Sequence, residues 1–91
     1  MASKSITPGQ AFTASDGGIK VTVIRVGSSK ERARFKIENL KTAKASYTVI
    51  VNRKSGADPD RIQYETDNPN NTGEYELSTD ETTGVEIKRN P

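Results

Sequence analysis

The fold is decided by residues 30–37, which read Lys-Glu-Arg-Ala-Arg-Phe-Lys-Ile. In an extended strand successive side chains point to opposite faces, so Ala33, Phe35 and Ile37 share one face and the cations share the other. An apolar face backed by a charged face is typical of a strand that is buried on one side. The pattern therefore predicts a strand over residues 30–38.

A helix is the alternative for the same stretch. Ser28-Ser-Lys-Glu31 has the spacing of a helix capping box, and a helix that followed it would align Ala33, Ile37 and Leu40. Phe35 would then point almost directly away from this apolar stripe, whereas the strand accounts for every residue. We therefore favour the extended form.

The composition of the whole chain also favours sheet. Val and Ile together number 13 against 2 Leu, and there are 10 Thr. β-Branched residues fit pleated, half-buried surfaces and lose rotamer freedom in helices. A chain of 91 residues has the length of one domain, so we expect a single β domain over residues 1–91, with residues 1–8 and 89–91 as candidate arms.

Short alternating segments separated by turn formers run through the chain. Besides residues 30–38, strands are expected at residues 10–14, 19–26, 46–53, 61–66 and 74–78 and around Val85–Ile87, with clear turns at residues 16–18 and 67–73. Their inward side chains include Ile19, Val21, Val23, Tyr47, Val49, Val51, Ile62, Tyr64, Tyr75 and Leu77. Ile24 and Val26 face the other way, so the second strand is expected to be covered on both faces. This spacing predicts an all-β fold, a small antiparallel sandwich or barrel of six to seven short strands.

Two residue types that carry much of protein chemistry are missing from the sequence. There is no Cys and no His, which excludes disulfides, thiolate or imidazole metal sites, Cys nucleophiles and His-based triads. Asp58, Asp60 and residues 67–71 lack the ligand spacing of a calcium-binding EF-hand. Glu74 and Glu76 lie among solvent-type residues that offer a general acid no shielded pocket. We therefore expect no metal, no cofactor, no small-molecule substrate and no enzymatic activity.

The sequence also lacks signals for a membrane. No apolar run reaches the 18 residues that a membrane helix needs, and the first residues lack the apolar stretch of a signal peptide. We expect no membrane association and a cytoplasmic or virion location.

The charged side of residues 30–37 is the main candidate binding site. Its cations at alternate positions would stand about 6.5–7 Å apart on one sheet face, and they are Lys30, Arg32, Arg34 and Lys36. Nucleic-acid phosphates have a similar spacing, and each neutralised phosphate adds salt-sensitive affinity. Lys20 and Arg53 would extend the patch. The alternative is a solvated face whose repulsion is relieved by acidic residues across the sheet or on a neighbouring subunit, namely Glu74, Glu76 and Glu86.

The two parts of the chain carry opposite charge. Residues 1–56 contain 11 basic and 3 acidic side chains and residues 57–91 contain 3 and 9, which gives +8 and −6. Either the fold mixes both parts and the surface evens out, or a basic surface meets nucleic acid or the acidic surface of a neighbouring copy. We expect a homo-oligomer, with nucleic acid, RNA more than DNA, as the other candidate partner.

One part of the sequence resembles the central strands of single-stranded RNA bacteriophage coat proteins. It comprises residues 47–54 (YTVIVNRK), then Asp58-Pro59, then residues 61–64 (RIQY). In that family, basic and polar residues on the inner face of the sheet grip an RNA hairpin. The resemblance therefore implies RNA contact by the nearest basic matches, Arg53, Lys54 and Arg61. Those coat proteins end in two helices that lock a dimer, whereas this sequence ends in a predicted hairpin, so its dimer would be built differently.

Another part resembles the carbon storage regulator family of RNA-binding dimers. Gly9-Gln10, Ile19–Val23, Val26-Gly27 and Arg34–Asn39 occur here in the order that the family has them. The family recognises RNA through arginines at its first and last strands. This sequence has Ser5-Ile-Thr7 and Lys44–Tyr47 at those places, so the resemblance implies a shared fold without those RNA-binding residues.

Taken as a set, these features predict a non-catalytic, self-assembling β protein, such as a small phage or virus coat or decoration subunit. Leu, Ile, Val and Phe total only 17 residues, and a domain with so little core often relies on neighbouring subunits or a ligand. The basic sheet face would contact nucleic acid or a neighbouring subunit. The alternatives are an RNA-binding regulator and a small inhibitor that acts by protein–protein contact.

Overall fold

The computed structural model describes residues 6–67 and 73–91, and these residues form strands and no helix. Seven strands follow one another along the chain: β1 (Ala11–Thr13), β2 (Ile19–Arg25), β3 (Arg34–Asn39), β4 (Ser46–Arg53), β5 (Asp60–Glu65), β6 (Gly73–Glu76) and β7 (Thr82–Arg89). The all-β prediction is confirmed. The part of the chain described here holds no helix that could cross a membrane.

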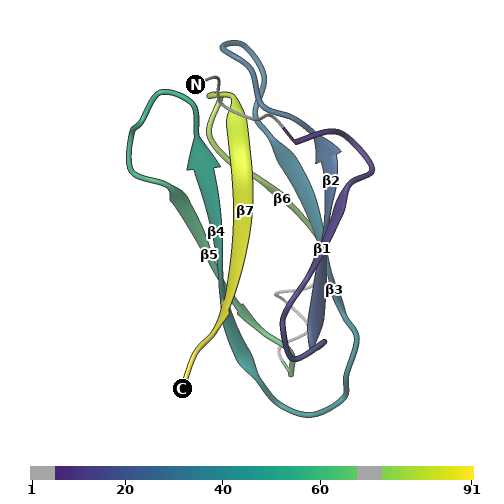
Figure 1. The fold of residues 1–91 in the computed structure, drawn as a ribbon. Helices are drawn as coiled ribbons and strands as arrows, with labels where there is room; N and C mark the ends of the chain where they lie inside the picture. Colours follow the sequence, from purple (N-terminus) through teal and green to yellow (C-terminus); the bar gives the residue numbers. More distant parts are fainter. Residues whose placement is uncertain (1–5, 68–72) are drawn as a thin grey trace.

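The strands form two antiparallel sheets that face each other (Figure 1). The four-stranded sheet has the order β1-β2-β3-β6, and the three-stranded sheet has the order β5-β4-β7. β1, β2 and β3 pair with their neighbours in sequence, whereas β6 and β7 cross between the sheets to pair with β3 and β4. The architecture is the small antiparallel sandwich that the sequence predicts.

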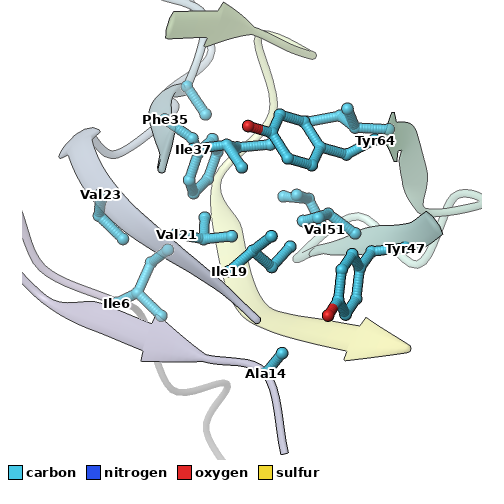
Figure 2. Close-up of a cluster of buried hydrophobic side chains, with 13 residues drawn as sticks. Ile6, Ala14, Ile19, Val21, Val23, Phe35, Ile37, Tyr47, Val51 and Tyr64 are labelled. Carbon is cyan, nitrogen blue, oxygen red and sulfur yellow. The ribbon is translucent and has the colours of Figure 1, made fainter. Parts of the chain in front are cut away.

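The core lies between the two sheets (Figure 2). Ile19, Val21 and Val23 of β2 are at most 1% exposed, because alternation along the strand directs all three toward the other sheet. The buried side chains that meet them are Phe35, Ile37, Tyr47, Val49, Val51, Ile62 and Tyr64. Burial of one such side chain contributes about 1.5–3 kcal/mol. The predicted inward set is therefore the core, with Tyr75 and Leu77 half-buried at its margin.

A β-bulge interrupts the alternation near the end of β2. Val23 lies opposite Phe35, but the next paired residues are Arg25 and Arg34, so Ile24 is the extra residue of β2. The bulge leaves Ile24 38% exposed and turns Val26 inward, where it packs against the core. The prediction that β2 is covered on both faces is therefore wrong at Ile24, since a sheet face without a covering layer leaves that side chain in solvent.

Residues 28–31 form a turn. The N–H groups of Lys30 and Glu31 donate to Ser28 Oγ at 3.2 and 3.0 Å, and the Ser28 N–H donates to the Glu31 carbonyl oxygen. One of the two capping-box hydrogen bonds thus forms, from the Glu31 N–H to Ser28 Oγ, but the Ser28 N–H bonds the Glu31 backbone carbonyl and not its side chain. The bonds close a tight turn, and no helix follows. Strand β3 begins at Arg34, so the strand prediction is confirmed for residues 34–38 and wrong for residues 30 and 31, which lie in the turn. Ala33 is buried as predicted, and its N–H and C=O bond Ser78 and Leu77 in continuation of the pairing between β3 and β6.

Two tyrosines of the three-stranded sheet reach polar groups of the four-stranded sheet. The Tyr47 hydroxyl lies 3.0 and 2.9 Å from the two carboxylate oxygens of Asp16, in the turn before β2. Gly18 is required beside it, because a Cβ at this position would overlap the Tyr47 hydroxyl. The Tyr64 hydroxyl donates to Asn39 Oδ1 at the end of β3. These contacts fix how the two sheets face each other at one end of the sandwich.

The ends of the described chain pack on the domain. Ile6 is buried, Arg89 is the last residue of β7, and the Asn90 N–H donates to the Ser46 carbonyl oxygen at 2.8 Å. Ile6 and Asn90 therefore contact the sandwich, whereas Thr7, Pro8 and Pro91 are exposed. β7 begins at the buried Thr82, earlier than predicted. Most of the loop predicted at residues 67–73 lies outside the described residues.

Candidate functional site

The outer face of the four-stranded sheet carries most of the predicted charged residues. Its outward positions alternate with the core positions and meet in rows across the strands. Lys36 lies between Thr22 and Glu74, and Lys20 lies opposite Glu38. The face therefore presents cations and carboxylates side by side.

Five charges form one ion-pair network, in which Glu31 lies farthest from its partner, 4.0 Å from Arg25 Nε. Arg34 Nε lies 2.6 Å from Glu74 Oε1, and Arg34 Nη1 lies 3.4 Å from Glu76 Oε2. Arg25 Nη2 lies 3.1 Å from the same Glu76 oxygen. Because Arg25 and Arg34 face each other at the bulge, Glu76 offsets the repulsion between their guanidinium groups. Exposed pairs of this kind contribute about 0.2–1 kcal/mol each.

The four cations predicted as one stripe are not collinear. Arg34 and Lys36 stand on the outer face of β3, whereas Lys30 lies in the preceding turn and Arg32 lies just before the strand. Arg32 Nη1 donates to the Leu77 carbonyl oxygen at 3.3 Å. The turn that Ser28 closes takes Lys30 out of the alternation, because the chain bends at residues 29–31.

The two residues expected to extend the patch belong to different sheets. Lys20 lies on β2 and shares the outer face with Lys36. Arg53 ends β4 in the three-stranded sheet, where its guanidinium donates to Ser78 Oγ at 3.1 Å and to the Asp58 carbonyl oxygen. Arg53 therefore ties two loops together and does not enlarge the charged face.

The three predicted acidic residues do not share one face either. Glu74 and Glu76 stand on β6 and are held in the network with Arg34. Glu86 stands on β7 in the other sheet, opposite Ile50. For Glu74 and Glu76, the structure has the arrangement that the solvated-face alternative describes, with the charges paired inside the chain.

A second polar cluster surrounds Asp16. The N–H of Gly18 at 2.9 Å, the Tyr47 hydroxyl and Arg89 Nη1 at 2.7 Å together hold the pKa of the Asp16 carboxyl below its usual value. Burial, and after it the Asp16 carboxylate, raise the pKa of Tyr47. Asp16 therefore stays ionised and Tyr47 stays protonated, which suits a contact that holds the fold in place.

A shallow hollow lies near the C-terminal end of the described chain. Its volume is about 280 Å³, and it is lined by Lys44, Ala45, Ser46, Glu65, Arg89, Asn90 and Pro91. Its two cations already have carboxylate partners, since Lys44 Nζ lies 3.6 Å from Asp67 and Arg89 bonds Asp16. Among residues 6–67 and 73–91 no group of three acidic side chains is placed to hold a metal ion.

Strand β5 forms an open edge of the three-stranded sheet. It pairs with β4 from Asp60 to Glu65 without a bulge, and within the described residues no strand pairs with its other side. Soluble proteins usually protect such edges with charged side chains, above all Lys, or with Pro or a bulge. The sequence of β5, DRIQYE, contains no Lys and no Pro, and its charged residues are Asp60, Arg61 and Glu65. Its edge is therefore open to a strand that offers complementary charges.

Comparison with known proteins supplies no template for these surfaces, since no family model, no curated protein and no solved structure matches the chain. The resemblances to the phage coat proteins and to the carbon storage regulators therefore remain predictions. Of the basic residues matched to the coat family, Arg61 lies on the outer face of β5 and Arg53 is bound to loops. Lys54 Nζ lies 3.8 Å from a carboxylate oxygen of Glu81.

Arg25 and Asp16, which join several partners in these clusters, are absent from the sequence-based set of sites. Arg25 joins the network only because the bulge turns it toward Arg34. Asp16 stands in an Asp-Gly-Gly run that predicts a turn. Nothing in this run predicts that Asp16 contacts Tyr47. Their partners lie 51 and 31 residues away along the chain, beyond the reach of any local pattern.

Proposed function

We propose that this protein is a non-catalytic, self-assembling β-sandwich subunit, of the kind that builds or decorates a phage or virus coat. The observation that carries the proposal is the open edge of β5, an unbulged strand that lacks Lys and Pro. An edge strand with these properties is a ready template for pairing with another chain. The β5 edge would then serve to join one subunit to the next.

The small core supports the same proposal. The core depends on a single layer of side chains between two sheets, and a domain of this size gains little stability to spare. Pairing with further copies would bury additional surface and add backbone hydrogen bonds. Assembly would then stabilise the subunit by mass action, since a partner that binds only the folded state favours folding.

Neither Asp16 nor Asp80 has the pKa direction of a general acid. Hydrogen bonds, from Gly18 first of all, lower the pKa of Asp16, and the Ser55 hydroxyl first of all lowers the pKa of Asp80. A carboxyl that serves as a general acid needs a raised pKa. Both groups are instead held in the ionised form by contacts that shape turns.

Sedimentation velocity over a range of micromolar concentrations tests the proposal. We expect species larger than the monomer, with a population that grows with concentration and persists at high salt because backbone pairing is not screened. A single monomeric species at the highest concentration, in low and in high salt, would overturn the proposal.

An RNA-binding regulator is the second candidate function. It is favoured by three lysines on or beside the four-stranded sheet that form no ion pair among the described residues, Lys20, Lys30 and Lys36. Neutralised phosphates would give affinity that falls steeply with salt. The test is filter binding of single-stranded RNA by the double variant Lys20→Glu, Lys36→Glu, with Lys54→Glu on the other sheet as the control. Equal binding by all three proteins would exclude this function.

A further inference from the structure

The hydrogen bonds at the end of β5 reveal which backbone groups face its open edge. The Thr66 N–H donates to the Ala45 carbonyl oxygen at 3.0 Å, which continues the pairing of Ser46 with Glu65 by one residue. In an antiparallel ladder, residues that bond one neighbour alternate with residues whose N–H and C=O point the other way. Thr66 therefore belongs to the set that bonds β4.

The other β5 residues follow from this alternation. Ile62 and Tyr64 direct their backbone groups toward β4, whereas the intervening residues direct theirs to the open edge, and these are Arg61, Gln63 and Glu65. The β7 side of β4 agrees, since the Asn90 N–H bonds the Ser46 carbonyl oxygen and not that of Ala45. The open edge thus presents a regular row of unpaired donors and acceptors.

The side chains of the same three residues are complementary to those of a second copy of the strand that runs in the opposite direction. Arg61 and Glu65 are exposed on the outer face, at equal distances along the strand on either side of Gln63. A two-fold rotation about Gln63 generates a second, antiparallel strand. In this pair of strands, Arg61 of each copy lies opposite Glu65 of the other. An isologous interface requires this self-complementarity.

We propose that β5 pairs in antiparallel fashion with β5 of a second copy, about a two-fold axis at Gln63. Arg61 of each copy then lies opposite Glu65 of the other, and Ile62 lies opposite Tyr64. The three edge-facing residues become hydrogen-bonded partners of one another, so their backbone donors and acceptors are satisfied together. This inference rests on the proposed self-assembly and names the strand, the partner and the register.

Other two-fold registers of β5 are less favourable. An axis at Arg61 or at Glu65 would place like charges directly opposite, which destabilises a strand pair. An axis at Ile62 would place Glu65 opposite Pro59, which has no N–H to donate. An axis at Tyr64 would move Arg61 past the end of the partner strand. Among these axes, only the one at Gln63 places the three edge-facing residues opposite one another with Arg61 against Glu65.

Strand β7 is the other edge of the same sheet and is less suited to the role. It lies beside β1, and its last residue, Arg89, is bound to Asp16. It also carries Lys88, the type of residue that protects an edge, and a bulge interrupts its pairing with β4 at Asn52. The β5 pairing would join two three-stranded sheets into one sheet with β7 at both ends.

Charge reversal at the two outer positions tests the proposal by sedimentation equilibrium. Arg61→Glu and Glu65→Arg should each raise the dimer Kd at least about tenfold, since two attractive contacts become two repulsive ones. An equimolar mixture of the two variants should dimerise like the wild type, because each copy then meets the opposite charge. The double variant Arg61→Glu, Glu65→Arg should also recover. Glu86→Lys on β7 is the matched control and should leave the Kd unchanged.

The outcomes separate the inference from the proposed function. If the wild type assembles but neither single variant weakens it, or if only Glu86→Lys does, the β5 register is wrong while self-assembly stands. If the wild type is monomeric, both fail. Arg61 lies opposite Ile50 and could affect folding, so Glu65→Arg, which lies opposite Ser46, provides the independent variant. If both single variants dimerise more weakly and their equimolar mixture does not regain the dimer Kd of the wild type, the pairing would also be overturned.

Discussion

Arg34 and Glu74 are 40 residues apart in the chain, yet Arg34 Nε lies 2.6 Å from Glu74 Oε1. This pair joins β3 to β6, the strand that returns from the other sheet to complete the four-stranded sheet. Glu76 and Arg25 lie next to this pair. Of the two outward cations of β3, Arg34 is therefore balanced by carboxylates of the same sheet, and Lys36 is not part of this network. The ion pairs on this face therefore also help to fix the register between β3 and β6.

Reversal of the charge at Arg34 should destabilise the fold. Arg34→Glu would place a third carboxylate beside Glu74 and Glu76, so we expect the free energy of unfolding to fall by about 1 kcal/mol in urea denaturation at low salt. The loss should shrink at high salt because exposed charges are screened. Lys30→Glu makes the same charge change in the turn and should lower the free energy of unfolding much less. Equal losses in the two variants would contradict the network.

Two isoleucines of β2 should respond very differently to truncation. Ile19 is fully buried, so Ile19→Ala should cost about 2–5 kcal/mol through lost burial and the cavity left behind. Ile24 is the exposed residue of the bulge, so Ile24→Ala should cost less than about 1 kcal/mol. Chemical denaturation of both variants provides the measurement. Similar losses would show that the bulge is misplaced.

The contact between Gly18 and Tyr47 should appear as coupling in a double-mutant cycle. Tyr47→Phe removes the hydrogen bond to a carboxylate and should cost about 1–2 kcal/mol. Gly18→Ala should cost more, because its Cβ would overlap the Tyr47 hydroxyl. In the double variant the hydroxyl is absent, so the combined loss should be smaller than the sum. Simple additivity, measured by thermal or urea unfolding, would refute the contact.

The stability of the protein should decrease in acid in part because of Asp16. Its pKa in the folded state lies below the ordinary value of 3.8, so the unfolded chain takes up the proton first as the pH falls. The stabilisation is therefore complete well above pH 3.8 and is lost as the pH falls through the lower folded value. Asp16→Asn should make the urea midpoint depend less on pH in the range between about 3.8 and the lower folded pKa. Asp58→Asn, in the exposed loop before β5, is the control. An unchanged acid profile in Asp16→Asn would be inconsistent with this contribution.

Much of the core could be predicted without a structure. The alternation around Phe35 and the alternation of Tyr47 with Val49 and Val51 identify their buried faces, and the structure buries all of these residues. The candidate site could be predicted only in part, because Lys36 and Arg34 stand where alternation places them and Lys30 does not. A capping-box spacing is satisfied equally by a turn, so it could not reveal where β3 begins.

The sequence by itself determined which side chains face inward along each unbulged stretch of strand, because side-chain direction in an extended chain is a local, period-two property. The bulge in β2 reversed that pattern for Val26. The tertiary structure alone decided which strands became neighbours. It placed β6 beside β3, brought Asp16 to Tyr47 and left β5 at an edge. These pairings join residues far apart in the chain, and they depend on loop closure and on the packing of both sheets, which no local pattern encodes.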